Sequence, residues 1–190
     1  MSAQQSAKLL PALFENIDPE HRFEVLNIGP ALPETVAFFS DYRCKLHFVD
    51  PFSALPLVAD PEGDVSLAQR VDKAMEGLAA DARIDLCLFW DLFNYLQPEA
   101  LRLIDERLRP FLAPGCHGHG FSVHNTRAPQ QDVTFSIERP DALRLRPRPG
   151  RLAGYAPLAQ SKLKETLQGF DIRRTVLLAD SRLEMLLAAR

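Results

Sequence analysis

Apolar residues follow one another along this chain in two alternating patterns, one with the period of a strand and one with the period of a helix. Short apolar runs, which predict strands, cover residues 23–28, 45–49, 84–90 and 119–123. The run 84–90 is apolar apart from Asp85, which is typical of a strand buried on both faces of a parallel sheet. Apolar residues three or four positions apart predict amphipathic helices at 10–17, from Pro33, over 65–78, from Pro98 and over 158–167.

The order of these elements indicates the fold class. Strands and helices alternate, and two final β-like runs at 172–178 and 183–187 are separated by a short polar turn that predicts an antiparallel hairpin. We therefore expect an α/β protein: a doubly wound, mostly parallel sheet of six or seven strands with a C-terminal antiparallel hairpin and helices on both faces. Residues 1–190 are expected to form one domain, in which 126–157 are an insertion or substrate-side hairpin.

Three local expectations concern how these elements begin and pack. Pro33 suits the first position of its helix, because its fixed φ is already helical, and this helix should turn Val36, Phe38 and Phe39 toward the core. The segment 18–21 should end the first helix, and 113–115 should form a turn before the strand at 119–123.

Composition and charge exclude several function classes. The chain is 46% hydrophobic and 25% charged with a net charge of -3, which argues against a general attraction to nucleic acid or to membranes. The cysteines Cys44, Cys87 and Cys116 form no CxxC pair, which argues against a disulfide framework or a zinc finger. The N-terminal residues lack the pattern of a signal peptide, and no apolar run is long enough to span a membrane. We expect a reduced, soluble, cytoplasmic protein.

Candidate ligand-binding residues lie where the predicted strands end. In open α/β sheets ligands bind outside the carboxyl ends of the strands, where Gly29, Asp50, Trp90 and Asp91 fall. An acid at the position of Asp50 is placed to accept hydrogen bonds from ribose hydroxyls. Each residue also has a purely structural interpretation: a tight turn for Gly29, an Asp-Pro turn for Asp50, and a core side chain with a satisfied N–H for Trp90.

Four segments taken in order resemble the class I S-adenosylmethionine-dependent methyltransferases. They are VLNIGPALPETVAFF at 25–39, KLHFVDPF at 45–52, the segment 84–123 and the closing segment 169–190. Together they cover nearly the whole chain. The resemblance implies that S-adenosylmethionine is the cofactor. It implies that Gly29, Ala31 and Asp50 bind this cofactor and that Trp90 and Asp91 lie beside it.

The sequence departs from the family pattern at the cofactor loop and after Asp50. The family's glycine-rich loop is replaced by Gly29-Pro30-Ala31-Leu32-Pro33, whose two prolines remove two backbone donors. Asn27 stands where the family has an acid. About 33 residues separate Asp50 from the strand at 84–90, so the family's third strand is either shrunken, at 55–58 before Asp60, or missing.

Other residues suggest weaker candidates. Cys116, His117 and His119 lack a clear fourth ligand, so we expect no metal site. His124 is the candidate general base. Six arginines gather in the insertion: Arg127, Arg139, Arg144, Arg146, Arg148 and Arg151. Arg144 and Arg146 could bind an anionic substrate or acidic partner, or simply protect a solvated sheet edge.

Two functional hypotheses remain open from the sequence. The chain is either a methyltransferase acting on an unidentified small molecule or protein, or a catalytically inactive methyltransferase-like scaffold that binds a partner. The retained Asp50 favours the first, and the altered loop favours the second. A dehydrogenase ranks third, because its fingerprint needs more glycine at the same turn.

Overall fold

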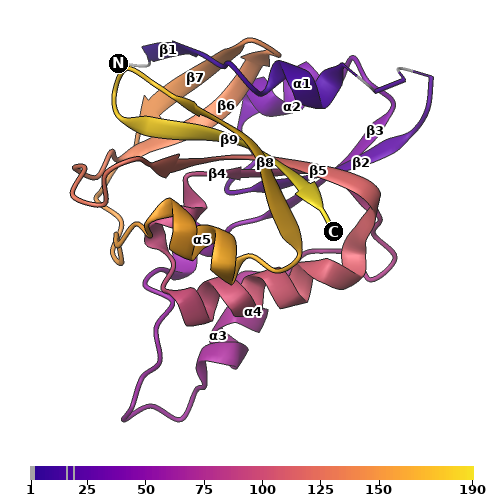
Figure 1. The fold of residues 1–190 in the computed structure, drawn as a ribbon. Helices are drawn as coiled ribbons and strands as arrows, with labels where there is room; N and C mark the ends of the chain where they lie inside the picture. The colour runs from indigo at the N-terminus through magenta and orange to yellow at the C-terminus, as the bar shows by residue number, and fades with distance from the viewer. Residues whose placement is uncertain (1–2, 16, 19) are drawn as a thin grey trace.

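The computed structural model describes residues 3–15, 17–18 and 20–190. Its centre is a six-stranded sheet with the strand order β3-β2-β4-β5-β9-β8 (Figure 1). Four of the strands are parallel: β2 (Phe23–Ile28), β3 (Cys44–Val49), β4 (Ile84–Trp90) and β5 (Leu112–Val123). The last two, β8 (Phe170–Leu177) and β9 (Arg182–Ala189), pair antiparallel, and β9 also runs antiparallel to β5. A mixed α/β fold with a mostly parallel central sheet, as the sequence predicts, is therefore confirmed.

A second, antiparallel sheet of three strands lies against one face of the first. It consists of β1 (Ala3–Ser6), β7 (Ala142–Pro147) and β6 (Val133–Arg139), in that order. The strands β6 and β7 form an antiparallel hairpin within 126–157. That this segment is an insertion or lies on the substrate side stays a prediction. The strand β1 had no counterpart among the predicted elements, and it pairs with β7 from the other end of the chain.

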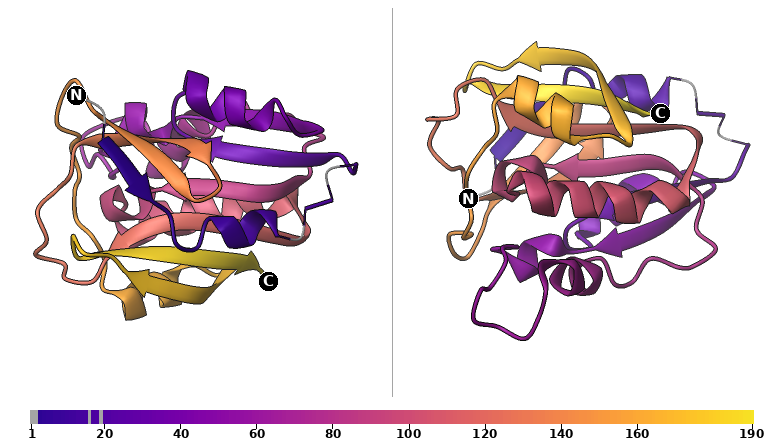
Figure 2. Two further views of the ribbon diagram at one scale, coloured as in Figure 1. Left: turned by 90° about the horizontal axis from the view of Figure 1, so that it is seen from above. Right: turned by 60° about the horizontal axis from the view of Figure 1, so that its bottom comes forward.

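Helices cover both faces of the large sheet (Figure 2). One face packs against α3 (Leu67–Ala74), α4 (Pro98–Leu108) and α5 (Gln160–Thr166) in one hydrophobic cluster. The other face packs against α1 (Pro11–Phe14), α2 (Pro33–Phe39) and the small sheet in a second cluster. Three short 3₁₀ helices complete the fold: η1 (Pro51–Ala54), η2 (Leu92–Tyr95) and η3 (Arg109–Phe111).

A buried carboxylate attaches the N-terminal segment to the large sheet. Glu184 of β9 accepts hydrogen bonds from the backbone N–H groups of Lys8, Leu9 and Leu10, at 2.8 to 3.1 Å. The Nε2 atom of His119 on β5 lies 2.9 Å from the same carboxylate. Burial raises the pKa of Glu184, but the hydrogen bonds from His119 and the backbone lower it more, so that it stays below its usual range.

Several local expectations were wrong. Val36 is 43% exposed, because Thr35 and Phe39 face the core instead, and the Thr35 hydroxyl accepts the Ile137 N–H of β6. The helix α3 begins only after Ser66, which forms a capping box with Gln69, and so is shorter than 65–78.

Two other segments also differ from expectation. The first helix ends at Phe14, well before Ile17, and Pro19 of the breaking segment 18–21 lies outside the described residues. The strand β5 begins at Leu112, so the turn expected at 113–115 is an irregularity within it, where its pairing with β4 shifts register. Residues 55–58 form no strand, so the family's third strand is missing at this position.

Candidate functional site

The carboxyl ends of β2, β3 and β4 meet at one edge of the large sheet, because β2 lies between the other two. The residues that follow these strands, Gly29, Asp50 and Asp91, are those that the sequence places at a ligand-binding edge. Gly29 has φ +117°, a conformation that other residues rarely adopt, and its N–H donates to the Val49 carbonyl at 2.7 Å. Glycine is therefore required here by the backbone of the turn.

Trp90, at the end of β4, is a core residue. Its indole N–H donates to the Asn27 side-chain oxygen at 3.0 Å, and its ring stacks on Phe135 of β6 with centroids 5.7 Å apart. This is the structural alternative that the sequence left open for Trp90. Asn27, at the position where the family has an acid, accepts this indole hydrogen bond.

The side chain of Arg148 fills the crevice between these strand ends. Arg148 follows β7, and its guanidinium carbon lies 4.4 Å from the centroid of the Phe52 ring. Its Nη2 atom is 3.5 Å from a carboxylate oxygen of Asp91, and the two side chains are only 8% and 7% exposed. The hollow left beside Gly29, which Phe52 and Arg148 also line, measures about 10 Å³.

Burial and Arg148 act in opposite directions on the two acids of the crevice. Burial raises the pKa of Asp50, and the positive charge of Arg148 partly offsets this rise. Burial raises the pKa of Asp91 to about 6, again against the lowering effects of Arg148 and Arg182. The Oδ1 atom of Asp50 is buried without a hydrogen-bond partner among the described residues.

Neither a protein-family model nor a curated protein matches this sequence. Solved structures do match. The glycopeptide N-methyltransferase MtfA, solved with S-adenosylmethionine, is 14% identical with a TM-score of 0.50, and the match covers 95% of this chain and 92% of MtfA. The mitomycin 7-O-methyltransferase MmcR is 11% identical with a TM-score of 0.51, covering 95% of this chain and 53% of MmcR. The chain has the class I methyltransferase fold.

A third match has the same fold but a different length. The pyocyanin biosynthetic protein PhzM is 13% identical with a TM-score of 0.51, and the match covers 95% of this chain and 54% of PhzM. The chain thus spans about half the length of PhzM and of MmcR. At these identities the likeness concerns the fold, and the site must be judged from this chain's own residues.

Within the methyltransferase fold, the predicted cofactor residues occupy different environments. Gly29, Asp50 and Asp91 border the filled crevice, Trp90 is in the core, and Ala31 is exposed on the loop before α2. Their roles in binding S-adenosylmethionine stay predictions. The two side chains that fill the crevice, Phe52 and Arg148, were not among these candidates. Arg148 belongs to the arginine cluster noted in the insertion, but nothing in the sequence indicates its long reach.

A second hollow of about 40 Å³ lies beyond Asp91, on the side of β9. Two buried polar atoms at this hollow, Asn94 Oδ1 and Arg182 Nη1, have no partner among the described residues. A water needs about 10 to 15 Å³ of such volume, so the hollow has room for a few waters. It has no room for a substrate of ordinary size.

The remaining candidates lie apart from the crevice. His124 is exposed after β5, where its backbone N–H donates to Ser181, and it lines neither hollow. Cys116 packs on the face of the sheet that carries α3 to α5, whereas His119 faces the other cluster with Trp90. In residues 3–15, 17–18 and 20–190, no group of three or more His, Cys, Asp or Glu side chains is placed to hold a metal ion.

Arg144 and Arg146, the candidate anion-binding residues, are paired within the chain. Arg146 contacts the carboxylate of Glu34 on α2, and Arg144 contacts Glu138 and lies 3.6 Å from Glu34. Binding of an anionic partner by these arginines stays a prediction, and such a partner would compete with two internal carboxylates. Among the helices of the described residues, none has the length and apolar content to cross a membrane.

Proposed function

We propose that this chain is a non-catalytic relative of the methyltransferases, a binding scaffold whose cofactor crevice is filled by its own Arg148 side chain. The observation that carries the proposal is the position of that guanidinium, over the Phe52 ring and beside the Asp91 carboxylate. It lies where the strand ends of this fold meet and ligands are bound.

The size of the crevice supports this proposal. Sites for small molecules and cofactors usually measure about 300 to 1,000 Å³. The hollow beside Gly29 measures about 10 Å³. For S-adenosylmethionine to reach Gly29, Phe52 or Arg148 has to leave its place, so the residues present do not fit the cofactor in this conformation.

Electrostatics adds to the size argument. The methyl group of S-adenosylmethionine sits on a sulfonium cation, which a neighbouring guanidinium repels. Moving Arg148 away leaves Asp91 buried without this partner, and breaking a buried ion pair costs about 3 to 5 kcal/mol. The 3.5 Å separation points to the lower part of that range. Even about 3 kcal/mol weakens binding roughly a hundredfold.

One observation favours the second candidate, an active methyltransferase in which Arg148 swings aside. The Oδ1 atom of Asp50 is buried at the crevice with no partner among the described residues, so one acceptor is left for a ligand hydroxyl. In that case Asp50 would bind the cofactor ribose, as the family resemblance implies.

Calorimetric titration with S-adenosylmethionine and with its demethylated product separates the two candidates. For the wild-type chain we expect no heat of binding at millimolar ligand. Arg148→Ala should bind measurably more tightly than wild type, because the ion pair no longer has to break. Arg151→Ala, an exposed arginine three positions along the chain, is the matched control and should change nothing.

Two results would count against this reasoning. Micromolar binding by the wild-type chain, abolished by Asp50→Ala, would establish the cofactor site and refute the scaffold proposal. If Arg148→Ala and Arg151→Ala bind equally weakly, then Arg148 is not what closes the crevice.

A further inference from the structure

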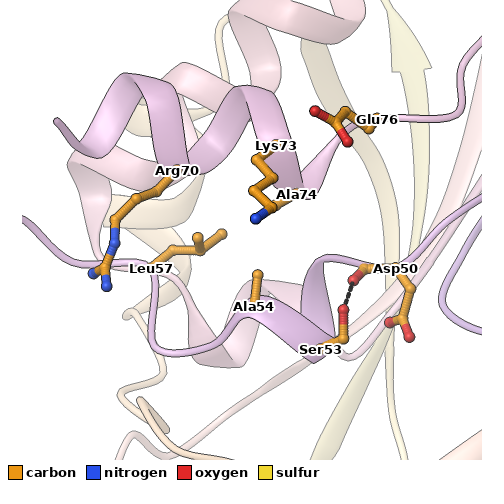
Figure 3. Close-up of a pocket in the computed structure, with 8 residues that line it drawn as sticks. All are labelled: Asp50, Ser53, Ala54, Leu57, Arg70, Lys73, Ala74 and Glu76. Carbon is orange, nitrogen blue, oxygen red and sulfur yellow. Dashed lines mark hydrogen bonds between the residues drawn. The ribbon is translucent and has the colours of Figure 1, made fainter. Parts of the chain in front are cut away.

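A larger hollow lies outside the crevice, in a groove between η1 and α3 (Figure 3). Its volume is about 470 Å³, which is in the usual range for small-molecule sites of about 300 to 1,000 Å³. The groove is open because residues 55–66, which connect its two walls, form neither helix nor strand. The family's third strand would fall in this interval.

The floor of the groove is apolar. Leu57 and Ala74 are buried side chains of the hydrophobic core, and Ala54 lies beside them at the end of η1. Ala54 is exposed, whereas Leu57 and Ala74 are only 2% and 8% exposed, so most of the apolar surface that a ligand could remove from water here belongs to Ala54. The floor therefore fits a compact apolar or aromatic body.

Two cations stand on one wall. Arg70 and Lys73 are three positions apart on α3 and so share one face of the helix. One Arg70 nitrogen donates to the Val58 carbonyl at 2.9 Å, which fixes the guanidinium at one end of the groove and leaves its other donors available. The Lys73 side chain points toward Ala54 (Figure 3), and no carboxylate of the described residues lies within 4.0 Å of its ammonium group.

Neither acidic residue that lines the groove, Asp50 or Glu76, forms an ion pair within 4.0 Å with Arg70 or Lys73 in the described part of the chain. The Asp50 carboxylate points away from the groove, and only its backbone carbonyl, which accepts the Ser53 hydroxyl at 2.7 Å, faces it (Figure 3). Glu76 lies at the far end, beyond Lys73. Asp72, next to Lys73 in sequence, is paired with Arg107 instead.

We propose that this groove binds a small organic anion, with its apolar body on the floor that Ala54, Leu57 and Ala74 form and its acidic group between Arg70 and Lys73. The apolar floor selects the body, and the two cations select a carboxylate, sulfonate or phosphate. This site does not depend on S-adenosylmethionine or on the state of Arg148.

A pair of fluorescent probes that differ only in charge tests the site. The anionic probe is 8-anilinonaphthalene-1-sulfonate, and the neutral one is N-phenyl-1-naphthylamine, which has the same rings without the sulfonate. We expect saturable binding of the sulfonate, about tenfold tighter than that of the neutral probe. Near-ultraviolet circular dichroism on the same samples establishes that the chain is folded, since this sulfonate also binds partly unfolded chains.

Three variants locate the binding. Lys73→Glu should weaken sulfonate binding by about tenfold, whereas Arg127→Glu, the same charge change at an exposed position away from the groove, should leave it unaltered. Ala54→Trp adds bulk at an exposed position of the groove and should weaken the binding of both probes. Absence of saturable sulfonate binding, equal affinity for the two probes, or equal effects of Lys73→Glu and Arg127→Glu would overturn the proposal.

Discussion

Asp91 should make the free energy of unfolding of this protein fall as the pH rises, which is the opposite of the usual effect of a carboxyl group. Burial raises the pKa of this carboxyl to about 6, although Arg148 and Arg182 both lower it. In the native state Asp91 therefore keeps its proton up to about pH 6, whereas in the unfolded chain it releases it near its ordinary pKa of 3.8. Between these values unfolding releases a proton, so the contribution of Asp91 is fully present below 3.8 and is lost as the pH rises through about 6.

The magnitude follows from the two pKa values. Each pH unit between 3.8 and about 6 lowers the free energy of unfolding by about 1.4 kcal/mol, and the whole interval by about 3 kcal/mol. Asp91→Asn removes the titration while keeping the shape of the side chain. From about pH 4 to about pH 7, the variant should therefore gain about 3 kcal/mol of stability relative to wild type.

Urea unfolding at a series of pH values measures this difference. The chain has one tryptophan, Trp90, which is buried next to Asp91 in sequence, so its fluorescence reports the transition. Asp41→Asn, at an exposed position, is the control and should follow wild type at every pH. Arg148→Ala should move the pH-dependent loss to higher pH, because Arg148 lowers the pKa of Asp91. Parallel curves for wild type and Asp91→Asn would refute the reasoning.

Two further predictions concern contacts that hold the fold together. A Cβ atom at Gly169 would lie 2.7 Å from Oδ1 of Asp105, whose other oxygen, Oδ2, accepts the Gly169 N–H. Gly169→Ala should therefore cost about 1 to 3 kcal/mol in thermal or urea unfolding. Gly150→Ala, with no atom within 4 Å of the new methyl group, is its control, and equal costs would contradict the clash. Glu184→Ala removes the acceptor of three backbone N–H groups and should speed hydrogen exchange at residues 8–10; unchanged protection there would show that Glu184 does not attach the segment.

Strands whose own residues form a recognisable apolar pattern could be predicted from the sequence. Strands that are ordered only by contacts with residues far away in the sequence could not. The runs 23–28 and 84–90 coincide with β2 and β4, because apolar residues predominate in both and each run is followed by a residue that breaks it, Gly29 or Asp91. The strand β1 has the sequence AQQS, with no alternation to mark it. It is ordered by pairing with β7 and by the attachment of residues 8–10 to Glu184, both far away in sequence.

The same distinction applies to the candidate site. Gly29, Asp50 and Asp91 could be placed at one edge of the sheet, because parallel strands bring their carboxyl ends together. Arg148 could not, because it reaches Asp91 across 57 positions in sequence, and only the docking of the inserted hairpin brings it there. In the sequence, Arg148 is one of six arginines between residues 126 and 157, and no pattern distinguishes it from Arg144 or Arg146.

Contacts in the structure connect Asn27, a departure from the family pattern, with the β6–β7 hairpin, which Arg148 follows. Asn27 accepts the indole N–H of Trp90, and Trp90 stacks on Phe135 in the inserted hairpin. The second strand of this hairpin ends at Pro147, so the next residue, Arg148, lies in the crevice beside Asp91. Since these contacts hold the small sheet against the strand ends, we expect that restoring the family's glycine at Pro33 alone would leave the crevice filled. Shortening the Arg148 side chain removes the group that fills it, so the proposed function predicts that Arg148→Ala, more than a change in the loop, opens the crevice to a cofactor.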